Sequence, residues 1–69
     1  MRKDKFNLSD LELDILQLVA KGYNNSDIAK TLYVSTHTVK AHLRIIFEKL
    51  NVNNRAFAVY IATKKRLID

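Results

Sequence analysis

Residues 25–50 read NSDIAKTLYVSTHTVKAHLRIIFEKL, and the spacing of their apolar positions predicts two helices separated by a short turn. Asn24 is placed to cap the first helix, roughly 25–32, whose inner stripe is formed by Ile28, Ala29 and Leu32. Ser35 is already the cap of the next helix, roughly 36–50, so only a tight joint remains between the two. The apolar stripe of this second helix consists of Val39, Leu43, Ile46, Phe47 and Leu50.

The polar side of the second helix forms a narrow outer arc. At 100° per residue, five positions fall within about 100° of one another on the face opposite the apolar stripe. They are His37, Lys40, Ala41, Arg44 and Glu48. Two helices joined by about three residues, the second with a mostly basic outer face, match the plan of a helix-turn-helix.

Two further helices are predicted on either side of this pair. Before it, Ser9 and Glu12 form a capping box that begins a helix at roughly 10–21, which Gly22 ends. The predicted inner stripe of that helix is Leu11, Ile15, Leu18 and Val19. After it, Asn51 ends the second helix and Asn54 caps a last one, roughly 55–66. The predicted fold is therefore all-α, with four helices in one domain.

Composition excludes several classes of protein. The chain has 69 residues, 48% of them hydrophobic, with one Gly, no Pro and no Cys. The lack of Cys excludes disulfide scaffolds, thiolate nucleophiles and Cys zinc sites. His37 and His42 lie about 140° apart on their helix, so they cannot hold one ion together, and no metal or cofactor is expected. No catalytic constellation occurs, so an enzyme is not expected, and a cytoplasmic location without membrane insertion is the default.

Positive charge is concentrated in the second half of the chain. Residues 1–34 contain five basic and five acidic residues, whereas residues 35–69 contain seven basic and two acidic residues, which gives the net charge of +5. A one-sided positive field favours a polyanionic partner such as nucleic acid or an anionic membrane surface, although a solubilising surface would give the same total.

With these features in place, the sequence resembles the LuxR-type (GerE-like) helix-turn-helix domain of bacterial transcription regulators. The resemblance covers about residues 8–68, with the order and spacing of its motifs intact. The matching residues are Leu8-Ser9, Glu12, residues 25–29, Val34-Ser35, Thr38-Val39-Lys40, His42, Ile46, Lys49-Leu50, Val52, Arg55 and Ala58-Val59. The chain is accordingly divided into a short charged arm, residues 1–7, and a DNA-binding domain, residues 8–69.

The resemblance implies a response-regulator output domain that binds double-stranded DNA in a sequence-specific manner. Its third helix would enter the major groove, with Lys40, Ala41 and Arg44 at base edges. Phosphate contacts would come from Ser35, Thr36, His37, Thr38, Lys49 and Arg55, and for Lys49 and Arg55 a structural role is open as well. It also implies a homodimer formed through the fourth helix, with RNA polymerase as a further candidate partner. The interface residues would be Phe57, Tyr60, Ile61 and Lys64.

Two other functions remain open at this point. A helix-turn-helix that has lost DNA binding would act as a protein-interaction module through its fourth helix. The terminal domain of a sigma-like factor would contact both promoter DNA and polymerase, and it would occur only within a longer chain.

Overall fold

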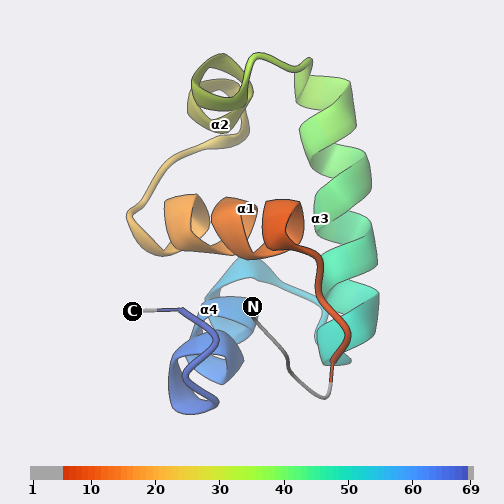
Figure 1. Ribbon diagram of the computed structural model, residues 1–69, viewed down its shortest axis with the longest axis vertical. Helices are drawn as coiled ribbons and strands as arrows, with labels where there is room; N and C mark the ends of the chain where they lie inside the picture. Colours follow the sequence, from red (N-terminus) through yellow and green to blue (C-terminus); the bar gives the residue numbers. More distant parts are fainter. Residues whose placement is uncertain (1–5, 69) are drawn as a thin grey trace.

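The computed structural model describes residues 6–68, which form four α-helices joined by short turns (Figure 1). The helices are α1 Asp10–Ala20, α2 Asn25–Leu32, α3 Thr36–Leu50 and α4 Arg55–Lys64. No strand occurs between residues 6 and 68, and the predicted all-α class is confirmed. The predicted arm, residues 1–7, lies mostly outside the described residues, and the division of the chain at this point stays a prediction.

Polar caps fix where each helix begins. The Oγ of Ser9 accepts the backbone N–H of Glu12 at 3.1 Å, and Oε1 of Glu12 accepts the N–H of Ser9 at 2.8 Å. This capping box satisfies two donors that an uncapped first turn would leave free. All four predicted cap residues occupy the position before their helix, and they are Ser9, Asn24, Ser35 and Asn54.

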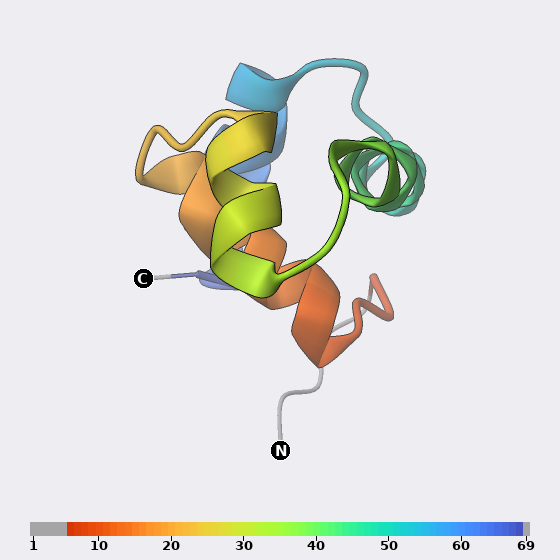
Figure 2. The same cartoon turned by 90° about the horizontal axis from the view of Figure 1, so that it is seen from above.

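Helix α3 forms one side of the molecule and packs against each of the other three helices. In Figure 1, α2 lies beside its first turns, α4 lies near its last turns, and α1 crosses between them. Figure 2 looks nearly along α3 and shows one of its sides turned away from the other helices. The largest fully buried side chains are Leu13, Ile15, Leu16, Ile28, Val39 and Ile46. One continuous core therefore fixes α3 and leaves its outer side uncovered.

Small residues bring α4 close to the core. Ala58 and Ala62, one turn apart, are both completely buried, and α4 packs against α1 as well as α3. Because Ala carries only a methyl group, the helix axes can approach closely without a cavity. The two aromatic residues of α4, Phe57 and Tyr60, are thereby left toward its outer surface.

Two details of the helices differ from the sequence predictions. Leu11 was placed in the inner stripe of α1 but is 41% exposed, and Leu13 and Leu16 are buried instead. The last helix ends at Lys64 rather than 66, because Arg66 has a φ of 57° and Leu67 donates its N–H to the carbonyl of Ala62. Such a left-handed residue closes a helix rather than continuing it.

Candidate nucleic-acid interface

The outer arc of α3 points away from the core. Val39, Leu43, Ile46 and Leu50 are buried and fix the inward side of the helix. The opposite side carries the five residues predicted for it, of which only Ala41 is half-buried and the others are exposed. These are His37, Lys40, Ala41, Arg44 and Glu48. The prediction that a mostly basic arc lies outward on one helix is confirmed.

Two cations on this arc are available to an external anion. Lys40 and Arg44 are exposed, lie one turn apart, and form no hydrogen bond or ion pair with another described residue. Because neither cation is bound within the domain, an external anion would not have to displace an internal partner in order to bind it. The short side chain of the half-buried Ala41 beside them does not project from this part of the helix surface.

A hollow of about 420 Å³ flanks the two cations. Its polar lining consists of Lys40, Arg44 and Glu48 of α3 together with Asn25 and Arg55. Its apolar lining consists of Leu43, Phe47 and Val52. The basic side of α3 is therefore accessible from the flank as well as from the front, and Glu48 is the one acidic group in this lining.

The first turn of α3 adds neutral donors to the basic arc. The Oγ of Ser35 accepts the backbone N–H of Thr38 at 3.0 Å and donates to Oγ1 of Thr38 at 3.0 Å. Thr36 and His37 are exposed, whereas Thr38 is half-buried. The start of a helix carries partial positive charge on its free N–H groups and favours an anion there.

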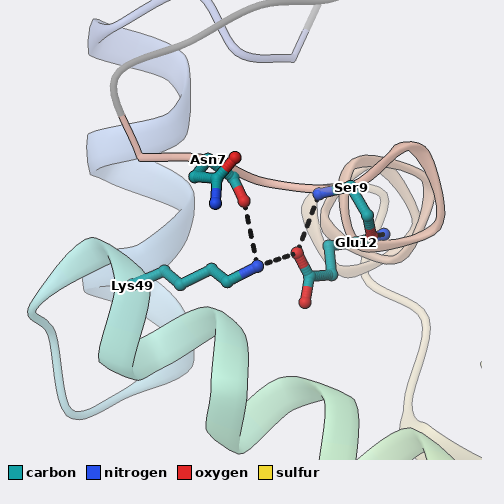
Figure 3. Close-up of polar contacts among 4 residues, drawn as sticks. All are labelled: Asn7, Ser9, Glu12 and Lys49. Carbon is teal, nitrogen blue, oxygen red and sulfur yellow. Dashed lines mark hydrogen bonds and ion pairs between the residues drawn. The ribbon is translucent and has the colours of Figure 1, made fainter.

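Lys49, predicted to contact phosphate or to serve structure, is engaged by its own chain (Figure 3). Its Nζ donates to Oε1 of Glu12 at 2.8 Å and to the backbone carbonyl of Asn7 at 2.9 Å. Burial alone would raise the pKa of Glu12, but the bonds from Lys49 and from the N–H of Ser9 outweigh it and lower that pKa. The ammonium of Lys49 therefore joins α3 to the start of α1.

Arg55 has a similar internal role at the other flank. Its guanidinium donates to Oδ1 of Asn25 at 2.8 Å and to the carbonyl of Tyr23 at 3.0 Å. The first turn of α4 is thereby tied to the start of α2. The partners of Lys49 and Arg55 are 37 and 30 residues away in the sequence, and no local pattern indicated them.

An apolar face of α4 lies away from the arc. Phe57 and Tyr60 are 46% and 52% exposed, and their rings stack with centroids 5.8 Å apart. The ammonium of Lys64 lies 5.7 Å from the centre of the Tyr60 ring. Ile61 is half-buried beside them. Three of the four residues predicted for a dimer interface are thus exposed together, and the fourth lies at the edge of the core.

Metal and membrane interpretations find no support among residues 6–68. No group of three or more His, Asp or Glu side chains in that part of the chain could hold a metal ion. None of the helices in the described part is long and apolar enough to cross a bilayer. His42 is half-buried, and its Nδ1 has no hydrogen-bond partner among the described residues.

The chain matches the model of a known protein family and is similar in sequence to known regulatory proteins. The model of the family described as "Bacterial regulatory proteins, luxR family" matches residues 6–62. Over 62 residues the chain is 50% identical to the oxygen regulatory protein NreC of Staphylococcus carnosus and 47% identical to that of Staphylococcus aureus. Each match covers 90% of this chain but 29% of the relative, so the chain spans about three tenths of the length of these proteins.

A solved structure agrees with the fold. The crystal structure of the response regulator ChrA of a haem-sensing two-component system superposes with a TM-score of 0.87 and 41% sequence identity. The superposition covers 99% of this chain and 32% of the ChrA chain. The four-helix arrangement therefore also occurs as about one third of a longer regulator.

Proposed function

Because residues 6–62 match its model, the chain belongs to the luxR family of bacterial regulatory proteins, and from this premise we propose that α3 binds the major groove of double-stranded DNA in a transcription regulator. The observation that supports this proposal most directly is that Lys40 and Arg44, on the outward arc of α3, have no partner among the described residues. A helix with free cations on its uncovered side fits both the width and the charge of that groove.

The proposed base contacts come from the centre of the arc. Lys40 and Arg44 pair with the O6 and N7 acceptors of guanine, for which long cationic side chains are suited. Ala41, between them, is short enough for the helix to approach the bases, and its methyl group packs against the thymine methyl. These three residues carry the sequence preference.

The proposed phosphate contacts lie at the start of α3. Ser35, Thr36, His37 and Thr38 present hydroxyl, imidazole and backbone N–H groups around the positive end of the helix dipole. We assign Lys49 and Arg55, which also belong to the predicted phosphate set, a different main task. Their contacts with Glu12 and Asn25 fix the orientation of α3 and α4.

The proposed assembly is a cytoplasmic homodimer that places one α3 in each of two half-sites. Its interface is the α4 face, and RNA polymerase is a further partner of the whole regulator. The support is the exposed stack of Phe57 and Tyr60, since two half-exposed rings on one helix are a typical anchor for a partner surface. Two-fold symmetry then predicts an inverted-repeat site with half-sites about one helical turn apart.

Selection of bound sequences from random duplexes tests the proposal directly. We expect enrichment of an inverted repeat, together with an affinity that falls steeply with salt, with a slope of about −0.9 per phosphate contact. A failure to retain any duplex at low salt would contradict DNA binding. In that case the protein-interaction module becomes the better function, because only the α4 face would then remain.

A further inference from the structure

Tyr33, in the turn between α2 and α3, combines a left-handed backbone with an almost fully exposed side chain. Its φ and ψ are 59° and 43°, the left-handed region, and its side chain is 94% exposed. Residues with a Cβ are disfavoured in this region, because the Cβ lies too close to a backbone carbonyl oxygen. An aromatic ring in this position buries almost nothing that would offset the strain.

The turn itself explains the backbone conformation but not the side chain. The N–H of Val34 donates to the carbonyl of Ala29 at 3.0 Å, and this bond across the end of α2 requires a left-handed residue at position 33. Elsewhere helix ends meet the same requirement with Gly22, φ 90°, Asn51, φ 59°, and Arg66, φ 57°. Of these, Gly and Asn tolerate the conformation better than a tyrosine does.

We propose that Tyr33 is a DNA-contacting residue, whose ring packs against a deoxyribose and whose hydroxyl donates to a phosphate at the edge of the groove that α3 enters. The inference rests on the proposed function and extends it to a residue of the turn. Strained and exposed residues are retained where function uses them, and Tyr is among the side chains that bond phosphate oxygens.

The position of Tyr33 favours DNA over a protein partner. It lies two residues before the cap Ser35, and the exposed Thr36 and His37 that begin the proposed interface follow directly after this cap. The turn lies at the top of Figure 1, whereas α4 lies at the bottom. In Figure 2 the same turn leads directly into the first turn of α3. Phe57 and Tyr60 belong to α4, so a partner that covers them would bind at the other end of the molecule from this turn.

The test measures stability and DNA affinity for the same variants. Tyr33→Gly relieves the backbone and removes the ring, so we expect the melting temperature to rise by about 4 °C while DNA affinity falls by about 10-fold. Tyr33→Phe keeps the ring and the strain, and we expect an affinity loss of about 3- to 10-fold without a change in melting temperature. Affinity is measured by fluorescence anisotropy with a short labelled duplex of mixed sequence.

Two controls separate a contact with the sugar-phosphate backbone of DNA from other effects. Because the phenol is neutral, both variants should leave the slope of log K against log salt unchanged, whereas loss of a phosphate-binding cation lowers its magnitude by about 0.9. The loss of affinity should also be equal on selected and mixed duplexes, because a phosphate group is the same whichever base it is attached to. Asn51→Gly, at the other end of α3, provides the matched left-handed position and should not weaken binding.

Each outcome supports or overturns the assignment. If Tyr33→Gly is more stable and binds DNA as the parent does, Tyr33 makes no DNA contact, and the exposed ring would then be open to a protein partner. If Asn51→Gly weakens binding equally, the effect comes from flexibility of α3 and the assignment is wrong. If the parent chain binds no duplex at all, the proposed function fails first, and this result is distinct from a failure of Tyr33 alone.

Discussion

The Nζ of Lys49 lies 2.8 Å from Oε1 of Glu12, and this ion pair connects the last turn of α3 to the first turn of α1. The carboxylate side chain is only 7% exposed, whereas that of the lysine is 31% exposed. Removal of the lysine would leave a largely buried charge with one remaining partner, the N–H of Ser9. The pair therefore acts on the orientation of the helix that carries the basic arc.

Stability should decrease in acid because of Glu12. Its pKa is lowered in the folded state, so the carboxylate stabilises the fold above its ordinary value near 4.5, and this contribution is lost as the pH falls through the folded pKa. We expect Glu12→Gln to lower the free energy of unfolding by about 1.5–3 kcal/mol at neutral pH and to flatten its acid dependence. Urea unfolding between neutral and acidic pH measures both effects.

A double-mutant cycle isolates the ion pair. Lys49→Met keeps most of the apolar stem, and the two single losses should exceed, when summed, the loss of the double variant. If the two losses were strictly additive, the contact would contribute nothing, and the acid dependence would have another origin.

Arg44→Ala should relax the base preference as well as weaken binding. A good cation contact to guanine discriminates against other bases by about 1–3 kcal/mol, and that preference disappears with the guanidinium. Competition between selected and mixed duplexes measures the ratio. Lys21→Ala, which removes one exposed charge at the end of α1, is the control and should leave the ratio unchanged. A uniform loss of affinity for Arg44→Ala would place this residue on phosphate instead.

Glu48→Gln should strengthen binding to all duplexes. Glu48 is exposed on the outer arc and lines the hollow beside Lys40 and Arg44, so its charge opposes an approaching polyanion. We expect an increase of a few-fold at low salt that shrinks as salt is raised, because screening reduces the repulsion. Asp10→Asn, in the first turn of α1, removes an equal charge elsewhere. An equal increase for both variants would mean that only net charge matters.

Substitution of Phe57 and Tyr60 by serine should reduce self-association and leave the fold intact. Both rings are about half exposed, so their loss removes partner surface rather than core. Sedimentation equilibrium measures the association constant, and thermal unfolding checks the monomer. Leu11→Ser, at an apolar residue of similar exposure on α1, is the control. Unchanged association of the α4 variant would contradict the proposed interface.

Gly22→Ala should destabilise the domain by about 1 kcal/mol, which corresponds to a melting temperature lower by about 4–8 °C. Gly22 has a φ of 90°, and a Cβ added there would meet no atom within 4 Å, so the cost comes from the backbone alone. Lys21→Ala, at a neighbouring residue with a φ of −80°, should cost far less. Equal losses would show that helix propensity, rather than the left-handed backbone, sets the effect.

Local signals in the sequence were sufficient for the helices. A polar cap, a few apolar residues at helical spacing and a residue tolerant of a left-handed backbone are all short-range features, and they predicted α2 and α3 with the bounds that the structure has. The same signals could not select the inner side of α1. Leucine or isoleucine occurs at six positions between 8 and 18, so spacing alone favoured Leu11 while packing chose Leu13 and Leu16.

The long-range polar contacts could not be predicted in this way. Glu12 was identified as part of a capping box, and its second task, the ion pair with a lysine 37 residues away, depends on how α1 crosses α3. The contact of Arg55 with Asn25 likewise depends on the approach of α4 to α2. The outward direction of the basic arc was predictable, because it follows from the buried stripe on the same helix.

The left-handed residues Tyr33 and Asn51 bracket α3 and hold it at 15 residues, a rod of roughly 22 Å at 1.5 Å per residue. The major groove is about 12 Å wide, which matches the diameter of a helix and not its length. Under the proposed docking, the base-contacting residues all lie within residues 36–44, and the remaining turns carry none of them. The two halves of α3 therefore have different roles. The first half contacts the duplex, and the second half, through Lys49, holds the helix to the rest of the fold.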